Sequence, residues 1–261
     1  MGSPAEREPR AADALVVLAL AGASWLAISA APSADLPVVV PHTLLALLFL
    51  GSVAGGAWLR RLPPAAFLAP GRLDAGTAFW TLAGTAGLSA TLLGLSEPLL
   101  DLFRALGRDY RPDLDRLEGW VRELPAAAAW PLLAGLAPLG EEAVFRGAAL
   151  RGWRNSAGPL PALLLSSALF AAIHQLPPRI VMTFILGLWF SGLALRSGGL
   201  AAPLLAHAAN NALVLALMHF RVAEIPAPAA AAGSVLAGIA AWRLFGRRAG
   251  PVQGSDPEPP S

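Results

Sequence analysis

The sequence contains no cysteine, no lysine and only one tyrosine. The absence of cysteine excludes disulfides, thiolate catalysis and zinc sites built from cysteine. All 19 basic residues are therefore arginines, which we attribute to the codon bias of a GC-rich bacterial genome rather than to function. The formal net charge is only +2 and the arginines are dispersed, so nothing in the sequence indicates nucleic-acid binding.

Charged residues are also scarce, because only 14% of the chain is Asp, Glu, Lys or Arg. A soluble domain of this length would carry about 25%. Hydrophobic residues make up 56% of the 261 positions, and the mean hydropathy is +0.58. This balance excludes an ordinary soluble protein and predicts a chain that is built for lipid.

Long apolar runs follow one another along most of the chain. A transmembrane helix needs about 20 predominantly apolar residues. We place such spans at about 14–31, 38–59, 77–95, 125–150, 159–174, 179–196, 200–219 and 227–245. The expected fold is an all-α, polytopic membrane helix bundle of about eight transmembrane helices, organised as a single integral membrane domain over residues 1–261. The proline-rich tail at about 250–261 is expected to be disordered.

The arginines are divided unequally between the two sets of loops. With about eight spans, eleven of the 19 fall on the side that holds both termini. They are Arg7, Arg10, Arg60, Arg61, Arg72, Arg151, Arg154, Arg196, Arg243, Arg247 and Arg248. Because cytoplasmic loops carry an excess of basic residues, we predict that both termini lie in the cytoplasm and that the protein resides in the bacterial inner membrane.

One long polar connection, 96–124, separates the third span from the fourth. Apolar residues recur in it at helical spacing, in two groups. The first group is Leu99, Leu102, Phe103 and Leu106, and the second is Leu114, Leu117 and Val121. This periodicity predicts two amphipathic helices that lie at the membrane interface.

The stretch Gly140–Gly147 places three charged residues inside the predicted span 125–150. Each ionisable group near the bilayer centre costs about 2.5–3.5 kcal/mol on insertion scales, so the three need mutual pairing or a function. Glu142 and Arg146 lie one turn apart on one helix face and can pair. Glu141 is rotated away from that face, which leaves one carboxylate without a partner.

Three further polar residues fall on predicted membrane helices: His174, His207 and Asn211. A lone intramembrane histidine more often bonds a backbone carbonyl of a neighbouring helix than acts in catalysis. Polar residues on three different predicted helices favour the catalytic interpretation, because a bundle that brings them together with Glu141 forms a polar cavity. Such cavities mark substrate or ion pathways.

The three segments that carry these polar residues resemble the motifs of a known family. The segments EEAVFR at 141–146, FAAIH at 170–174 and HAANN at 207–211 are similar, in order and spacing, to EExxxR, FxxxH and HxxxN of the CPBP intramembrane proteases. That family includes the CAAX prenyl proteases of the Rce1 type and the bacterial Abi proteins. The resemblance covers about 125–220, which would be the catalytic core, and no motif position departs from the pattern.

The resemblance implies an intramembrane glutamic endopeptidase and a role for each motif residue. Glu141 would be the general base that activates a water, and His174 would hold and polarise the same water. His207 and Asn211 would form the oxyanion hole, with Glu142 and Arg146 as structural support. The chemistry agrees: a carboxylate removed from water is a stronger base, and an oxyanion needs donors aimed at the developing charge.

A zinc-dependent version of the same protease is the first alternative. Glu141, His174 and His207 could bind zinc as a catalytic site with two histidines and one glutamate. The helical HExxH spacing is absent and Asn211 would be a poor zinc ligand, so we favour a mechanism without a metal or other cofactor.

Two alternatives from other classes use the same polar cavity. A transporter could relay protons or bind a cation there, although we find no inverted repeat with paired broken helices. The second of these alternatives is a non-catalytic membrane protein, such as an immunity protein.

As partners the resemblance implies membrane lipid and a membrane-associated substrate: a prenylated CAAX tail, a bacteriocin-type peptide, or a C-terminal sorting tail of the kind handled by the myxosortase branch. We rank the sorting tail slightly ahead on genome composition.

Overall fold

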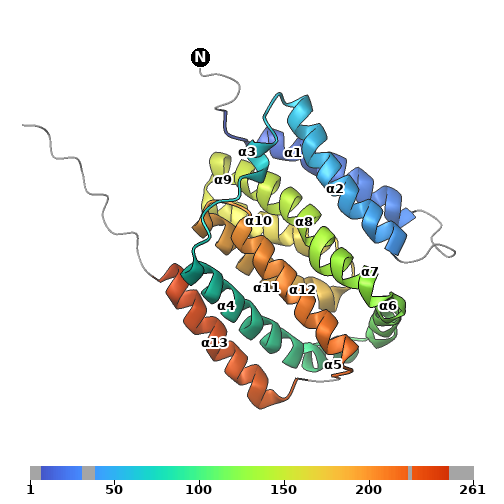
Figure 1. Ribbon diagram of the computed structural model, residues 1–261. Coiled ribbons are helices and arrows are strands. Elements are labelled where there is room, and N and C mark those ends of the chain that lie inside the picture. Colours follow the sequence, from blue (N-terminus) through green and yellow to red (C-terminus); the bar gives the residue numbers. More distant parts are fainter. Residues whose placement is uncertain (1–6, 31–38, 223–224, 247–261) are drawn as a thin grey trace, which may run out of the picture.

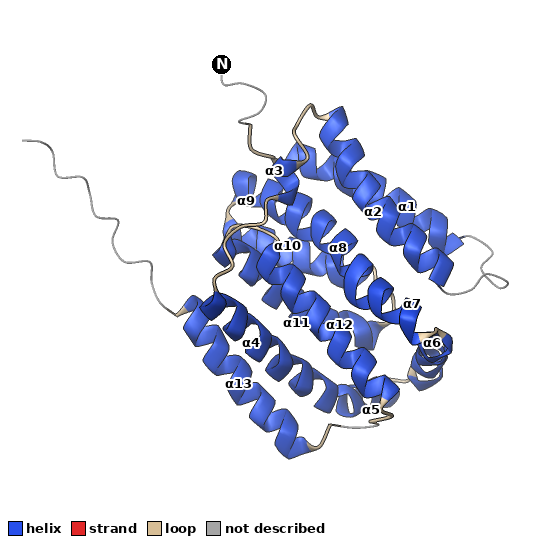
Figure 2. Cartoon of the chain, in the orientation of Figure 1, coloured by secondary structure: helices blue, strands red, loops and turns tan. Residues whose placement is uncertain are grey.

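The computed structural model describes residues 7–30, 39–222 and 225–246. Within these ranges every regular element is a helix and no strand occurs (Figure 2). The prediction of an all-α membrane helix bundle is therefore confirmed. The tail at 250–261, predicted to be disordered, lies outside the described residues.

The helices follow one another with short connections (Figure 1). They are α1 (Ala11–Ala30), α2 (Val39–Leu59), α3 (Ala65–Leu68), α4 (Ala75–Gly94), α5 (Ser96–Ala105), α6 (Arg111–Glu123), α7 (Ala126–Pro131), η2 (Leu132–Leu136), α8 (Ala137–Glu142), η3 (Ala143–Leu150), α9 (Arg151–Ala157), α10 (Pro159–Ala172), α11 (Pro177–Ser197), α12 (Ala201–His219) and α13 (Ala227–Phe245). The elements η2 and η3 are π-helical.

Each predicted span coincides with a helical segment, but the segments are not equivalent. In the described part of the chain, six helices are long and apolar enough to cross a membrane: α1, α2, α4 continued by α5, α11, α12 and α13. The predicted span 159–174 corresponds to α10, which has only 14 residues. At about 1.5 Å per residue, α10 is shorter than the roughly 30 Å hydrocarbon core.

The predicted span 125–150 is the central helix of the bundle, and two of its segments, η2 and η3, are π-helical. The chain is helical without a break from Ala126 to Ala157. Pro131 and Pro138 each lack a backbone N–H, which disturbs the regular α-helical hydrogen bonds around η2. Every residue of η3 is buried, and η3 packs against α1, α2, α10 and α11. The two glutamates of the charged stretch lie at the end of α8, which Figure 1 shows between α2 and α12, and Arg146 lies in the buried η3.

Two glycines allow this central helix to approach its neighbours closely. A Cβ at Gly140 would come 2.8 Å from the carbonyl oxygen of Ala46 in α2. A Cβ at Gly147 would come 2.6 Å from the carbonyl oxygen of Phe67 in α3. Since real side chains do not approach a backbone oxygen so closely, both positions require glycine. The two glycines that flank the charged stretch thus allow the central helix to pack closely against α2 and α3.

Segments predicted to lie on one side of the membrane meet at one end of the molecule. Asp13 is buried there and pairs with Arg7 at 2.9 Å and with Arg60 at 2.7 Å. The side chain of Asn155, in α9, donates a hydrogen bond of 2.8 Å to the carbonyl of Pro9. The N-terminal segment, the chain at Arg60 and α9 therefore lie at one end of the molecule, which agrees with the predicted placement of Arg7, Arg60 and Arg151 on one side of the membrane.

The predicted amphipathic helices of the 96–124 connection are confirmed as α5 and α6. Both lie at the end of the bundle away from α3 and α9 (Figure 1). An ion pair between Arg111 and Glu97 joins the two helices. The preceding helix, α4, begins at a capping residue, because Asp74 accepts a 2.8 Å hydrogen bond from the Thr77 N–H. That hydrogen bond holds the pKa of the exposed Asp74 carboxyl below its ordinary value.

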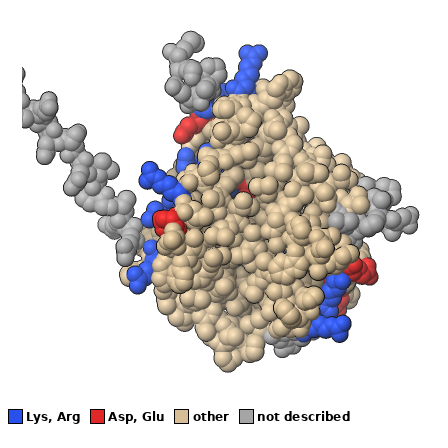
Figure 3. Space-filling view, in the orientation of Figure 1, with Lys and Arg blue, Asp and Glu red and all other residues tan. Residues whose placement is uncertain are grey.

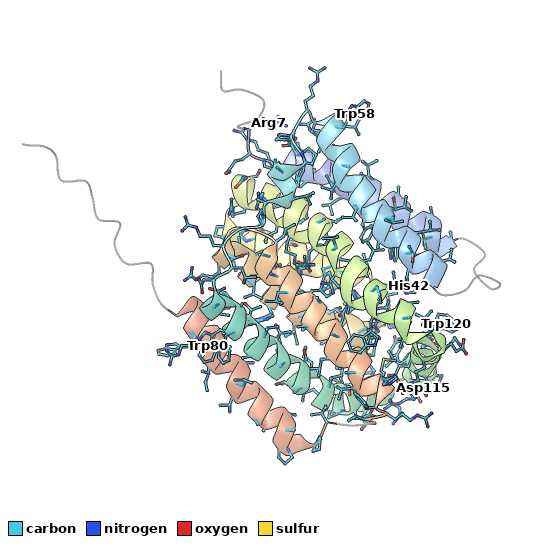
Figure 4. The ribbon with its side chains drawn as sticks, in the orientation of Figure 1. Arg7, His42, Trp58, Trp80, Asp115 and Trp120 are labelled. Atoms are coloured by element: carbon cyan, nitrogen blue, oxygen red, sulfur yellow. The ribbon has the colours of Figure 1, made fainter. Side chains whose placement is uncertain are left out.

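The surface has the distribution expected of a membrane protein. In Figure 3 the charged side chains gather at the margins of the visible face, and a broad uncharged area separates them. Figure 4 places Trp58 near Arg7 at one end and Trp120 near Asp115 at another. Trp58 is largely exposed. Exposed tryptophans near helix ends are typical of residues at the membrane–water interface.

Candidate active site

The predicted site residues come from four parts of the bundle. Glu141 and Glu142 end α8, and Arg146 follows in η3. His174 lies directly after α10, in the turn that leads to α11. His207 and Asn211 lie one turn apart in α12, which packs against α8 and η2.

The predicted pair between Glu142 and Arg146 is formed, and it is fully buried. Arg146 Nη1 donates to Glu142 Oε1 at 2.8 Å, and neither side chain is more than 1% exposed. The two residues are four positions apart, so the contact follows from the helix itself. A hydrogen-bonded ion pair is the arrangement that lets both charges remain in the interior.

Arg146 also binds the neighbouring helix α11 and an aromatic ring of α10. Its Nη2 donates to the carbonyl oxygen of Gly187 at 3.1 Å, and its Nε donates to the hydroxyl of Ser191 at 3.4 Å. The guanidinium lies over the ring of Phe170, with Cζ 4.4 Å from the ring centroid. This is a cation–π contact with the first residue of the second motif. Arg146 therefore ties the central helix to α10 and α11.

His207 bonds the buried carboxylate, a contact that the sequence does not predict. Its Nδ1 is 2.8 Å from Glu142 Oε1, and its Nε2 is 3.7 Å from Glu141 Oε2. A carboxylate only accepts hydrogen bonds, so we assign the proton to Nδ1. The imidazole also stacks on Phe190, with ring centroids 4.9 Å apart and planes inclined by 20°. His207 thus stands between the two carboxylates in a fixed orientation.

The two adjacent carboxylates differ in access. The Glu141 side chain is 19% exposed, whereas that of Glu142 is 1% exposed. Glu142 Oε1 accepts from both Arg146 and His207, while its Oε2 is buried and has no hydrogen-bond partner among the described residues. Glu141 is therefore the carboxylate that water or a substrate can reach.

His174 is held by the end of α10, and Phe170 of that helix contacts both imidazole rings. Its Nδ1 is 3.0 Å from the carbonyl oxygen of Phe170, so Nδ1 donates and Nε2 is left as an acceptor in the neutral ring. The Phe170 ring lies edge-on to both imidazoles, at 5.1 Å from His174 and 5.5 Å from His207. Among the described residues, no direct hydrogen bond or ion pair joins His174 to Glu141.

Asn211 bonds a backbone carbonyl that a proline leaves free. In η2 the N–H of Ala137 bonds the carbonyl of Leu132, five residues earlier. The next carbonyl in this register, that of Leu133, would need the N–H of residue 138, which is proline. Asn211 Nδ2 donates to Leu133 O at 2.8 Å instead. One of the two Nδ2 hydrogens is thereby used, and the other is left for a second acceptor.

The residues proposed as zinc ligands do not form a metal site. Across the described ranges, no group of three or more His, Cys, Asp or Glu side chains is arranged to hold a metal ion. The candidate ligands are Glu141, His174 and His207. The His207 Nδ1 faces Glu142, and both histidine rings pack against Phe170.

One charged residue near the site, Arg179, is not among the site residues that the sequence predicts. In the structure it occupies the first turn of α11, is half-buried and interacts electrostatically with Glu141 and His174. Its position five residues after His174 was a signal in the sequence, because a tight turn keeps such residues close.

The fold and the site define a multi-pass helical membrane protein with two carboxylates and two histidines close together among its helices. Residues 123–213 match the family model for type II CAAX prenyl endopeptidase Rce1-like proteins. The match covers all three motifs and confirms the predicted resemblance to the CPBP family over this segment. The family implies an intramembrane endopeptidase that acts on membrane-associated substrates. No curated protein and no solved structure matches the chain.

Proposed function

We propose that the protein is an intramembrane glutamic endopeptidase that hydrolyses a peptide bond of a membrane-associated protein or peptide. The observation that carries this proposal is the unequal pair of carboxylates around His207. Glu142 is buried and bonded to Arg146, whereas Glu141 is partly exposed and lies beside the same imidazole. Two neighbouring carboxylates in different environments can serve different chemical roles.

In this proposal Glu141 takes a proton from the attacking water. It is the only one of the two carboxylates with access to the outside of the protein core, and it makes no ion pair with Arg146. The water oxygen then bonds the carbonyl carbon of the scissile peptide, and the proton on Glu141 is later given to the leaving amine. This order of transfers is general base catalysis followed by general acid catalysis.

His174 would hold the same water through its second ring nitrogen. Because Nδ1 donates to the carbonyl of Phe170, Nε2 carries the lone pair and can accept a hydrogen bond from water. The hydrogen bond to Phe170 also fixes the plane of the ring. A water held by Nε2 of His174 and by the Glu141 carboxylate would be oriented for attack.

The oxyanion would be bound by His207 and Asn211. His207 Nδ1 donates to Glu142, so Nε2 can donate to the oxyanion only when the ring carries both protons. Asn211 would supply its second Nδ2 hydrogen, because the first is bonded to Leu133. Donors fixed before the reaction stabilise the developing negative charge.

A chelator is expected to leave activity unchanged, because the mechanism uses only side chains of this chain. The measurement is peptide cleavage by the protein in liposomes, before and after treatment with 1,10-phenanthroline. Loss of cleavage that is restored by added Zn²⁺ would establish the zinc-dependent alternative. A soluble zinc protease assayed in the same vesicles provides the positive control for chelation.

The substrate class proposed is a membrane-associated tail, with the C-terminal sorting tail ranked ahead of bacteriocin-type and prenylated peptides. The proposed location is the bacterial inner membrane, with both termini in the cytoplasm. The direct experiment is mass spectrometry of membrane-protein C-termini in cells with and without this protein. A set of C-termini that shortens only when the protein is present supports the proposal. Identical C-termini in both cells would contradict the sorting-tail assignment.

A further inference from the structure

A chain of hydrogen bonds connects α4 to Asn211. Ser89 Oγ in α4 donates to Asn210 Oδ1 at 2.8 Å. Asn210 Nδ2 donates to Asn211 Oδ1 at 3.0 Å. Asn211 Nδ2 then donates to the carbonyl oxygen of Leu133 at 2.8 Å. Three side chains from two helices are thus bonded in series to the backbone of the central helix.

The direction of these bonds fixes which way each amide faces. A carboxamide has an acceptor end and a donor end that are nearly equal in shape, so its orientation depends on its partners. The Leu133 carbonyl can only accept, so the Nδ2 end of Asn211 must face it and Asn211 Oδ1 must face Asn210. Asn210 therefore turns its Nδ2 toward Asn211 and its Oδ1 toward α4. That Oδ1 needs a donor, which the Ser89 hydroxyl supplies.

The Ser89 end of this chain of hydrogen bonds is buried, so the partner of Asn210 there cannot be replaced by bulk water. Ser89 is 2% exposed and Asn210 is 9% exposed. A buried polar group that loses its partner is left unsatisfied or turns toward another acceptor. Removal of the Ser89 hydroxyl would leave Asn210 Oδ1 without its donor, so the Asn210 amide would be free to rotate. A rotated Asn210 would withdraw its Nδ2 from Asn211 Oδ1, and Asn211 would lose one of the two contacts that hold its amide.

Ser89 differs from the other polar residues on the same face of α4. Thr81, Thr85 and Ser89 are spaced four residues apart and are all buried. Thr85 accepts a 3.0 Å hydrogen bond from Trp189 Nε1, and Thr81 Oγ1 has no partner among the described residues. Among these three, only Ser89 is connected to the candidate site. It also lies outside the segment that matches the family model.

We propose that Ser89 and Asn210 are positioning residues, which hold the Asn211 amide with its donor end toward the reaction centre. The proposal rests on the proposed function, because it assumes that Asn211 stabilises the oxyanion. It gives α4 a part in the reaction, through a side chain that the three motifs do not include. Neither Ser89 nor Asn210 would touch the substrate.

The test is a double-mutant cycle between Ser89→Ala and Asn211→Ala, with cleavage measured in liposomes. The probe is a membrane-anchored peptide that the wild type cuts and the Glu141→Gln variant does not. We expect Ser89→Ala to lower kcat about tenfold with KM unchanged, since the lost interaction acts on the transition state. In the Asn211→Ala background the same substitution should have almost no further effect on kcat. An additive effect on kcat would contradict action through Asn211.

Thr85→Val is the matched control. It removes a buried hydroxyl and its hydrogen bond to Trp189 from the same helix face. We expect Thr85→Val to lower the melting temperature while kcat stays near that of the wild type. If Ser89→Ala also keeps the wild-type kcat, the positioning role is wrong even though the proposed function stands. If Glu141→Gln cuts every peptide that the wild type cuts, the proposed function itself fails.

Discussion

Replacing Glu141 with glutamine is expected to reduce peptide cleavage by about 10²–10⁴-fold, the range of general base catalysis. Glutamine keeps the volume and the hydrogen-bonding groups of the side chain but cannot take a proton from water. The neighbouring carboxylate cannot substitute, because Glu142 is 1% exposed and its Oε1 is bonded to Arg146 and His207. The measurement is cleavage of a membrane-anchored peptide in liposomes.

The stability of the Glu141→Gln variant should equal or exceed that of the wild type. The substitution removes a charge from the membrane interior, where an ionised group is unfavourable. The contact of Glu141 with His207 is long, at 3.7 Å, so little attraction is lost. A melting curve in detergent therefore separates loss of the base from loss of the fold. Normal cleavage by this variant would show that the protein is not a glutamate-dependent protease.

Glu142→Gln is the informative comparison for this experiment. From the sequence alone, Glu142 is only a partner of Arg146, and its substitution should lower stability while residual activity survives. The structure adds the bond to His207 at 2.8 Å. The variant is therefore expected to lose stability and also to lower kcat, because His207 loses the carboxylate that orients its ring. Normal cleavage by Glu141→Gln and none by a stable Glu142→Gln would exchange the two roles.

Replacing Arg146 with alanine is expected to lower the free energy of unfolding by about 3–5 kcal/mol, the usual cost of breaking a buried ion pair. Glu142 would be left in the interior with a charge and without its cation. The hydrogen bonds to Gly187 and Ser191 of α11 would be lost as well, together with the contact over Phe170. The expected result is a lower yield of folded protein and a lower melting temperature in detergent.

A surface arginine provides the control for this substitution. Arg116 in α6 is 63% exposed and lies 3.7 Å from Asp113. Exposed pairs contribute about 0–1 kcal/mol, so Arg116→Ala should melt close to the wild type. If Arg146→Ala melts as the wild type does and yet cleaves nothing, Arg146 acts in the chemistry rather than in support of it.

The helices and the charged pair could be predicted because their causes are local in the chain. A run of about 20 apolar residues has few alternatives to a membrane helix, whatever its neighbours. Helical spacing in the 96–124 connection predicted α5 and α6 in the same way. The contact between Glu142 and Arg146 follows from four residues of separation on one helix.

Two contacts of the site depended instead on how helices that are distant in sequence pack and rotate against one another. His207 lies 65 residues from Glu142 and Asn211 lies 78 residues from Leu133, so no local spacing relates them. Close packing of α12 on α8 and η2 turned both side chains toward the central helix. The motif spacing alone assigned His207 and Asn211 to one helix face and left their partners open.

The sequence by itself thus determined that this is a helical membrane protein with two carboxylates, two histidines and an amide in one segment of the chain. The tertiary structure alone decided which carboxylate is reachable, which one orients His207, and that Arg179 lies near the site. The physical reason is that hydropathy and helical spacing act over a few turns of one helix. Access of water to a side chain, the balance of charges and the direction of hydrogen bonds depend on contacts among several helices. These contacts are defined only by how the helices pack.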